Sequence, residues 1–172
     1  MRAGLSPICR GVAIATNRNR TVVERFDKLL GATNLDELED LCVPDMVNHA
    51  LAPSRPQGLT GTRQFLTESA ALFGDTGWTT LQVIAEGDFV VQHGTRGGHW
   101  QGGHLFGFDL RPGPYQREVV FVYRLHDGLI SDRWAVRDDL TMLRQLGAFP
   151  PAEAAAQPAG RQRPSRHGLG RT

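Results

Sequence analysis

The chain has 172 residues, of which 40% are hydrophobic and 22% are charged, a balance typical of one globular domain with tails. No apolar run approaches the roughly 20 residues of a membrane-spanning helix. Arg10 interrupts the apolar N-terminal stretch that a secretory signal would need. We therefore expect one domain over residues 16–149, a disordered N-terminal extension over 1–15 and a disordered Pro-, Ala- and Arg-rich tail over 150–172.

The net charge of +1 conceals a segregation of charge along the chain. Residues 1–20 and 158–172 each contain four arginines and no acidic residue. The segment between them is therefore acidic, which argues against nucleic-acid binding by the domain itself. The basic ends could contact nucleic acid or a membrane, but we favour solvated tails and expect neither partner.

Cys9 and Cys42 are the two cysteines, and neither belongs to a CxxC motif. Cys42 fits a small buried residue better than a thiol nucleophile or a metal ligand. A reduced, cytoplasmic setting is the interpretation that fits this cysteine content.

The first third of the chain has helical periodicity. Apolar residues recur at three- and four-residue spacing in 17–30, and Gly31 suits the end of that helix. Asn34 and Glu37 are spaced as a capping box, which predicts a second helix ended by Pro44. A third helix is predicted over 61–73, with Thr60 as its cap.

Strands are predicted in the remainder of the domain. The segments 78–85 and 89–100 flank the tight turn at 86–88, and 118–125 and 129–136 flank the turn at 126–128. The Gly- and Pro-rich segment 101–117 is expected to be a long connection, and 138–146 a closing helix. Helices followed by antiparallel hairpins predict an α+β fold, with a curved sheet and a pocket under three N-terminal helices.

Several short segments, in this order and spacing, resemble the SnoaL-like polyketide cyclases of the nuclear-transport-factor-2-like superfamily. They are Val22-Val23-Glu24-Arg25-Phe26, Val43-Pro44-Asp45-Met46-Val47-Asn48-His49, Ile84-Ala85-Glu86-Gly87-Asp88, Tyr123-Arg124-Leu125-His126-Asp127-Gly128-Leu129-Ile130 and Leu143-Arg144-Gln145-Leu146-Gly147. The resemblance implies a cone-like α+β barrel with a buried pocket. It also implies a homodimer, and activity without a metal or organic cofactor.

The resemblance also implies where catalytic groups would lie. Such cyclases close a ring by an intramolecular aldol step and use a carboxylate as general acid and base. Counting back from Leu143 puts that carboxylate at Ala135, and an assisting histidine at Phe121. Neither residue can transfer a proton, whereas Asn48 matches a polar pocket residue of the family. The mechanism must therefore differ or use other residues of the pocket.

Strand alternation suggests which residues share the pocket face. If Phe121 and Ala135 face the pocket, then Tyr123, Ser131 and Arg133 do too, giving an apolar, aromatic lining. Phe26 is expected to add to that wall from the first helix. Arg133 could polarise a carbonyl, or could be a structural ion-pair partner.

Histidines and one aspartate are further catalytic candidates. His93 or His104 could act as acid and base, since histidine titrates near neutral pH. A zinc site made by His93, His99 and His104 does not match a familiar spacing. Asp138 could act at the pocket mouth, although a carboxylate at a helix start often caps the helix.

These observations predict a cofactor-independent cyclase that folds a small polyketide-like substrate in an apolar pocket. A protein of the same fold that only binds a small molecule is one alternative. An epoxide-opening hydrolase or isomerase is another, and would need an acid facing a water-activating base.

Overall fold

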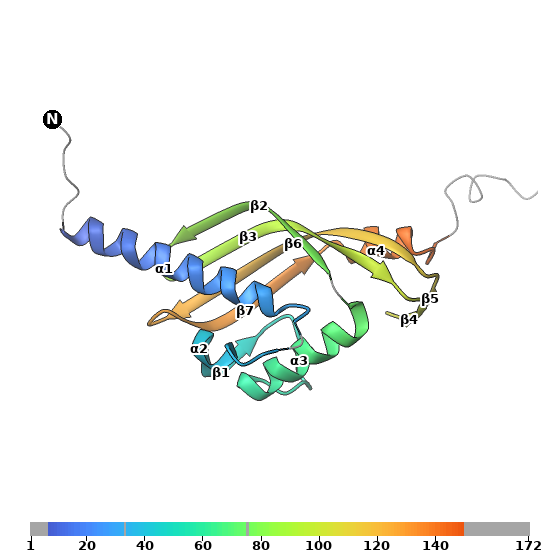
Figure 1. Ribbon diagram of the computed structural model, residues 1–172, viewed down its shortest axis with the longest axis horizontal. Helices are drawn as coiled ribbons and strands as arrows, with labels where there is room; N and C mark the ends of the chain where they lie inside the picture. The colour runs from blue at the N-terminus through green and yellow to red at the C-terminus, as the bar shows by residue number, and fades with distance from the viewer. Residues whose placement is uncertain (1–6, 33, 75, 150–172) are drawn as a thin grey trace, which may run out of the picture.

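The computed structural model describes residues 7–32, 34–74 and 76–149, and side chains from residue 16 onward. Three helices precede most of the strands, as an α+β fold requires (Figure 1). In chain order the elements are α1 (Pro7–Leu29), α2 (Leu38–Leu41), β1 (Cys42–Asn48), α3 (Gly58–Phe73), β2 (Gly77–Glu86), β3 (Phe89–Trp100), β4 (Gly103–Leu105), β5 (Phe108–Leu110), β6 (Gly113–His126), β7 (Leu129–Arg137) and α4 (Asp139–Gln145).

The main sheet has the strand order β1-β7-β6-β3-β2, and β4 and β5 form a separate two-stranded sheet. The sheet is curved and open, and the predicted α+β fold is confirmed. The predicted purely antiparallel order needs one correction, because β1 pairs parallel with β7. β1 is an edge strand, which explains how it accommodates Pro44, a residue without a backbone N–H.

α1 begins at Pro7, ten residues before the predicted start at Asn17. Residues 7–15 are therefore helical rather than disordered, and proline is favoured in the first turn of a helix. Residues 1–6 and the predicted tail 150–172 lie outside the described residues. The apolar stripe of α1 and the residue that follows the helix are buried as their spacing predicts: Val22, Val23, Phe26, Leu29 and Leu30.

The ends of several helices and strands differ from the predicted ones. Asn34 Oδ1 accepts a hydrogen bond from the Asp36 backbone N–H at 2.8 Å, so it forms a turn instead of a capping box. Glu37 is the N-cap of α2 and makes no side-chain capping bond. Cys42 starts β1 instead of ending a helix, and β6 begins at Gly113 inside the predicted connection.

Two hydrophobic clusters hold the layers together. The larger one lies between the sheet and α1, α2 and α3, and includes Phe26, Met46, Leu66 and Tyr123. The smaller one packs α4 and the small sheet against the C-terminal end of β3 and the N-terminal end of β6. Trp100, Tyr115 and Met142 are among its members. In Figure 1, α1 runs along the sheet, whereas α4, β4 and β5 gather at the opposite end from the start of α1.

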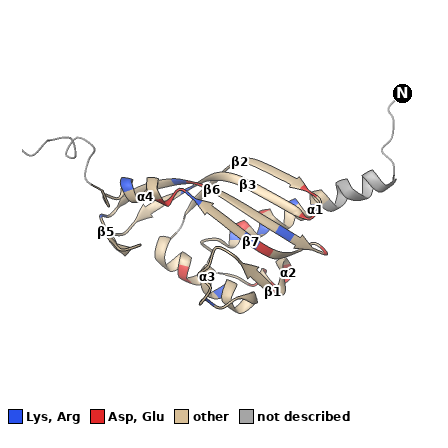
Figure 2. Cartoon of the chain, turned by 180° about the vertical axis from the view of Figure 1, so that it is seen from behind, with Lys and Arg blue, Asp and Glu red and all other residues tan. Residues whose placement is uncertain are grey.

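The other face of the sheet carries a row of apolar side chains across its middle, and no helix in the described part of the chain packs on it. Strand register places Ile84 beside Val91, Val91 beside Val122, and Val122 beside Trp134. Ile84 is 53% exposed, and Val136 on β7 is 71% exposed. Seen from behind, β6 and β7 carry several charged residues (Figure 2), and the register puts Glu118 and Arg124 of β6 on this face beside the apolar row. We call this surface the outer sheet face.

Candidate functional site

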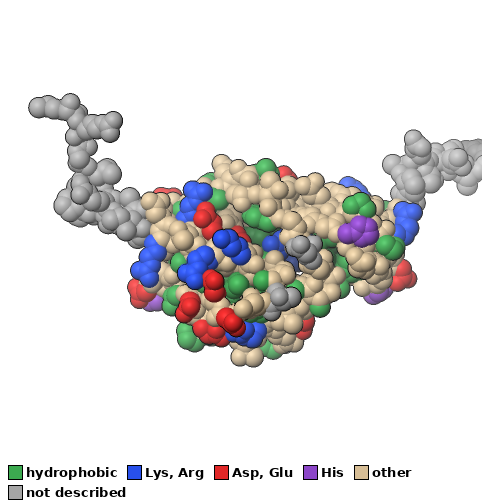
Figure 3. Space-filling view, in the orientation of Figure 1, with side chains coloured by type: hydrophobic (Ala, Val, Ile, Leu, Met, Phe, Trp, Pro, Cys, Tyr) green, Lys and Arg blue, Asp and Glu red, His purple; other side chains and the backbone are tan. Residues whose placement is uncertain are grey.

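A cleft of about 690 Å³ lies between the C-terminal half of α1 and strands β2 and β3. This volume suits a ligand of ordinary small-molecule size. The charged side chains Arg20, Glu24 and Lys28 line the cleft from α1. Figure 3 shows acidic and basic side chains mixed on the surface in the region of that helix. Among the described residues, Asp27 and Arg96 are the other charged ones that line the cleft. The uncharged lining residues are Leu30, Gly31, Ala32, Thr76, Trp78, Thr80, Val83 and Gln92.

Asp27 is the acidic group of this cleft that is buried. It lies on the inner face of α1, next to Phe26 and four residues after Val23, and is 9% exposed. Its Oδ1 accepts a hydrogen bond of 2.6 Å from the hydroxyl of Tyr123. Its Oδ2 is buried and has no hydrogen-bond partner among the described residues. The carboxyl therefore has one oxygen held by Tyr123 and one buried oxygen without a hydrogen bond.

Burial sets the titration of this pair. Burial raises the pKa of Asp27 above its ordinary value of 3.8, and it outweighs the Tyr123 hydrogen bond and the positive charge of Arg133, which oppose it. Burial and the adjacent carboxyl raise the pKa of Tyr123 well above its usual range. The Tyr123 hydroxyl therefore stays protonated and donates to Asp27.

We expect Asp27→Asn to increase the free energy of unfolding at about pH 8, with the gain shrinking towards about pH 4. A carboxyl whose pKa is raised in the folded state stabilises the fold most below the unfolded-state pKa. It loses that contribution as the pH rises through the folded-state pKa. Asn keeps an oxygen for Tyr123 and avoids the cost of burying an ionised carboxylate, which exceeds the stabilisation by Arg133 and Arg96. Urea unfolding across this pH range measures the effect.

Asp45→Asn is the matched control, because Asp45 is exposed on β1. The expectation is contradicted if Asp27→Asn is more destabilised at high pH than at low pH. That result would mean that the ionised carboxylate is stabilised by its arginine neighbours.

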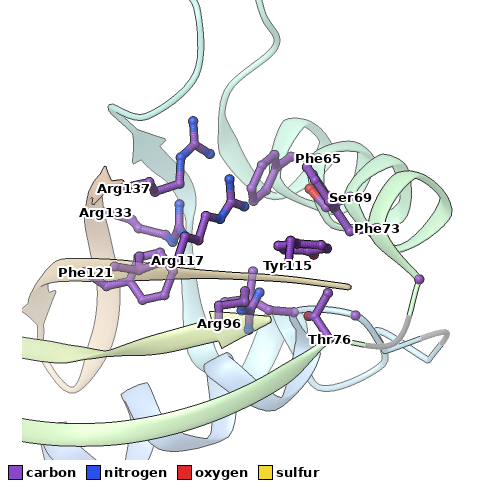
Figure 4. A pocket seen from close by; sticks show the side chains of 14 residues that line it. Phe65, Ser69, Phe73, Thr76, Arg96, Tyr115, Arg117, Phe121, Arg133 and Arg137 are labelled. Atoms are coloured by element: carbon purple, nitrogen blue, oxygen red, sulfur yellow. The ribbon is translucent and has the colours of Figure 1, made fainter. Parts of the chain in front are cut away.

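A second, smaller cavity of about 50 Å³ adjoins the cleft and shares Leu30, Gly31, Thr76 and Arg96 with it. Figure 4 shows arginines from the sheet on one side of it and α3 on the other. Its walls combine basic and aromatic side chains: Phe65, Ser69 and Phe73 from α3, Arg96 from β3, Tyr115, Arg117, Val119 and Phe121 from β6, and Arg133 and Arg137 from β7, with Gly74.

Arg133 is the most deeply buried arginine of this cavity, with 3% exposure. Its guanidinium lies 4.5 Å from the ring centre of Phe121 and 5.5 Å from that of Phe65. Its Nη1 donates to Asn48 Oδ1 at 3.3 Å. The rings and a neutral amide hold the charge in place without neutralising it.

The structure brings four of the sequence-predicted site residues together around the two cavities. Arg133 and Phe121 line the small cavity, Asn48 holds Arg133, and Tyr123 holds Asp27. The register pairs Phe121 with Ala135 and Tyr123 with Arg133, so these four share the inner face of the sheet as alternation predicts. Ala135 packs against the larger hydrophobic cluster and lines neither cavity.

The two histidines proposed as acid and base require correction in their placement. His93 lies on the outer sheet face, because the inner positions of β3 belong to Gln92 and Gly94; its Nε2 is 3.5 Å from Glu118 Oε1. His104 is exposed on β4 and contacts Asp109 at 3.0 Å. Neither lines either cavity. Among the described residues, no group of three His, Cys, Asp or Glu side chains comes together.

Asp138, Ser131 and Phe26 also lie away from the two cavities. Asp138 is the exposed N-cap of α4, and the hydrogen bond from Thr141 lowers the pKa of its carboxyl. Ser131 Oγ donates to Asp132 Oδ2 at 2.9 Å, at an irregularity that shifts β7 against β6. Phe26 is fully buried and supports Tyr123 edge-on, with ring centres 5.8 Å apart.

Sequence reasoning missed Asp27, Gln92 and Arg96. One signal was available for Asp27, since it lies four residues after Val23 and one after Phe26, within the apolar stripe of the first helix. A charged residue in such a stripe is either paired or functional. Gln92 and Arg96 share strand parity, but only the packing of α1 over β3 shows that their face is the inner one.

Comparison with known proteins agrees with this architecture. A model of the SnoaL-like polyketide cyclase family matches residues 20–146. No curated protein matches the chain. Within the part of the chain that the structure describes, no helix is long and apolar enough to cross a membrane.

Solved structures share the fold at low sequence identity. TsrD from Streptomyces laurentii aligns with a TM-score of 0.68 and 22% identity, over 77% of this chain and 97% of that one. IdmH from Streptomyces antibioticus, a proposed polyketide cyclase, gives 0.62 and 23% over 75% and 98%. A proposed SnoaL-like polyketide cyclase from Jannaschia sp. CCS1 gives 0.64 and 22% over 86% and 99%. The family match over most of the chain and the shared fold together establish that this chain belongs to the SnoaL-like polyketide cyclase family.

Proposed function

We propose that the protein is a cofactor-independent cyclase that closes a ring in a polyketide or related natural product by acid/base catalysis. The observation that carries the proposal is the buried Asp27–Tyr123 pair in a cleft of small-molecule size. A buried carboxyl with a raised pKa on the wall of such a cleft is suited to proton transfer. It would take the part of the carboxylate that the family resemblance places at Ala135.

The proposed reaction is an intramolecular aldol addition. Asp27 Oδ2 accepts a proton from the carbon between two carbonyl groups, and an enolate forms. That carbon attacks a third carbonyl group, elsewhere in the same molecule. One carbon–carbon bond forms, the carbonyl π bond breaks and an alkoxide is left. The alkoxide takes the proton back from Asp27, and the product is an isomer of the substrate. No oxidant, reductant or further reactant is needed.

Positively charged and polar groups near Asp27 would stabilise the charge that develops. Arg96 lines both cavities, and its guanidinium lies 5.8 Å from the ring centre of Trp78. A fixed cation in a partly dry site stabilises an enolate more effectively than water does. Trp78, Val83 and Leu30 supply apolar surface that would hold a flexible chain in a reactive conformation.

The direct test is incubation of the purified protein with a linear poly-β-ketone ester and separation of the cyclised products by liquid chromatography. The proposal expects faster ring closure, or one ring pattern enriched over the buffer control, and loss of both effects in Asp27→Asn. Unchanged products would favour the binding-only alternative. Conversion of an epoxide to a diol, with no ring closure, would favour the epoxide-opening alternative.

We also propose that two copies of the chain pair through the outer sheet face. A row of apolar side chains crossing four strands, with Ile84 and Val136 well exposed, is unusual on a surface that stays in water. A two-fold axis would bring this face against itself. Val136→Lys is expected to give a monomer in analytical ultracentrifugation, while the wild type sediments as a dimer.

Leu72→Lys is the matched control for this change. Leu72 is 44% exposed on α3, away from the outer sheet face. The variant is expected to remain dimeric. A monomeric wild type, or a Val136→Lys variant that stays dimeric, would exclude this surface as the interface.

A further inference from the structure

Among the residues that the structure describes, four arginines and no acidic residue line the small cavity. They come from three neighbouring strands, Arg96 on β3, Arg117 on β6, and Arg133 and Arg137 on β7. Figure 4 shows them on the sheet side of the cavity, facing Phe65 and Phe73 of α3. This concentration of positive charge in a mostly buried place needs an electrostatic explanation, because buried charges are normally paired.

Pairing within the protein accounts for only part of this charge. Arg117 and Arg137 both contact the carboxylate of Asp139, with Arg137 Nε at 3.4 Å from Oδ2. Arg133 contacts the neutral side chain of Asn48. Asp27 is the other carboxyl close to Arg96 and Arg133. Four cations therefore face two carboxyl groups, so the cavity keeps a positive excess even when Asp27 is ionised.

Unused hydrogen-bond donors accompany this excess. The Nε atoms of Arg96, Arg117 and Arg133 are buried without a partner among the described residues, and so is the hydroxyl of Tyr115. Arg133, Arg117 and Tyr115 are only 3%, 6% and 4% exposed, so water does not readily satisfy them. A ligand that accepts several hydrogen bonds and carries negative charge would supply what these donors lack.

The size of the cavity limits the kind of anion. About 50 Å³ is too little for the body of a substrate and is comparable to a carboxylate group. A carboxylate also presents two coplanar oxygens that match the fork of a guanidinium. The shared lining with the larger cleft would let such a group enter the small cavity while the carbon skeleton stays beside Asp27.

We propose that the arginine-lined cavity binds a carboxylate carried by the substrate, with Arg133, Arg117 and Arg96 as its ligands. The statement that this carboxylate belongs to the substrate rests on the proposed function. It makes a polyketide-type carboxylic acid the preferred substrate, and a neutral ester a weaker one. The ion contact would anchor one end of the chain and so fix which carbon lies next to Asp27.

The test compares two probes that differ only in charge. Isothermal titration calorimetry with 1-naphthoate and with its neutral analogue 1-naphthamide is carried out on the full-length protein. The carboxylate is expected to bind at least about tenfold more tightly than the amide, which corresponds to roughly 1.4 kcal/mol. Arg133→Met is expected to remove this preference. Arg124→Met, at an exposed position on the same strand as Arg117, is expected to keep it.

Several results would overturn the proposal. Equal binding of the two probes by the wild type would do so without any variant, so a failure of Arg133→Met to fold does not block the test. Tighter binding of inorganic phosphate than of naphthoate would identify a phosphate site instead. A preference that survives in a folded Arg133→Met and in Arg96→Met would place the anion elsewhere.

Asp27→Asn separates this proposal from the proposed function. The variant should bind naphthoate at least as well as the wild type, because one negative charge near the arginines is lost, yet it should not turn over a substrate. If the wild type binds the carboxylate but closes no ring, the cyclase proposal is wrong and the anion site stands. If the wild type closes rings in neutral esters and binds both probes equally, the anion site is wrong and the cyclase proposal stands.

Discussion

Asp27→Asn is expected to lower the rate of ring closure by about 10²–10⁴-fold, the usual contribution of a general acid or base. The amide keeps the shape of the side chain and an oxygen for the Tyr123 hydroxyl, which now donates to the carboxyl at 2.6 Å. It cannot accept a proton from carbon. Single-turnover rates with a linear poly-β-ketone ester would measure the loss directly.

The pH profile distinguishes this role from a structural one. Because the base must be ionised, the wild-type rate should rise with pH through the pKa of Asp27, which burial raises above 3.8. In Asp27→Asn this rise should be absent. Asp45→Asn changes the same group at an exposed position and should keep both the rate and the profile. An Asp27→Asn variant with the wild-type rate would remove Asp27 from the mechanism.

Phe26→Ala is expected to lower the free energy of unfolding by about 3–5 kcal/mol, the range for removing a large buried side chain. Phe26 is fully buried in the larger hydrophobic cluster and supports Tyr123 edge-on. The cavity left behind could not collapse easily, because α1 is held against the sheet on both sides of this position by Val23 and Leu30. Urea unfolding monitored by circular dichroism would measure the change.

Two control variants separate packing from other effects. Phe26→Leu keeps most of the volume and should lose clearly less stability. Phe106→Ala removes the same ring at a position that is 53% exposed, and should change stability by less than about 0.5 kcal/mol. A loss below about 1 kcal/mol in Phe26→Ala would contradict the role of Phe26 as a buried support. It would favour the interpretation that Phe26 forms part of a pocket wall that a ligand covers.

The register of β6 and β7 shows where the two positions without a proton-transferring residue lie relative to Asp27. Phe121 and Ala135, the positions to which the family resemblance assigns the histidine and the aspartate, are direct cross-strand partners. The neighbouring pair on the same face is Tyr123 and Arg133. In the proposed mechanism, Asp27 reaches that neighbouring pair from α1, so the acid/base group enters the pocket from a helix instead of the last strand.

The sequence alone determined the elements whose signals are local. The stripe of α1 follows from spacing of 3.6 residues per turn, and the hairpins β2–β3 and β6–β7 from tight turns between β-branched runs. Alternation put Phe121 and Tyr123 on one face of β6, and the register places Arg133 of β7 on the same side. Local chemistry also misled at Asn34, where a turn and a capping box compete for the same side chain.

Only the tertiary structure decided which face of each element meets which other element. Asp27 and Tyr123 are separated by 96 positions in sequence, and no spacing rule joins them. Alternation put His93 and Gln92 on opposite faces of β3, but the packing of α1 chose the face of Gln92 as the inner one. The arginine cavity likewise exists because three strands pair in one register, which aligns four separate side chains around one space. Burial then sets the charge properties of these groups, because the cost of desolvation depends on neighbours that are distant in sequence.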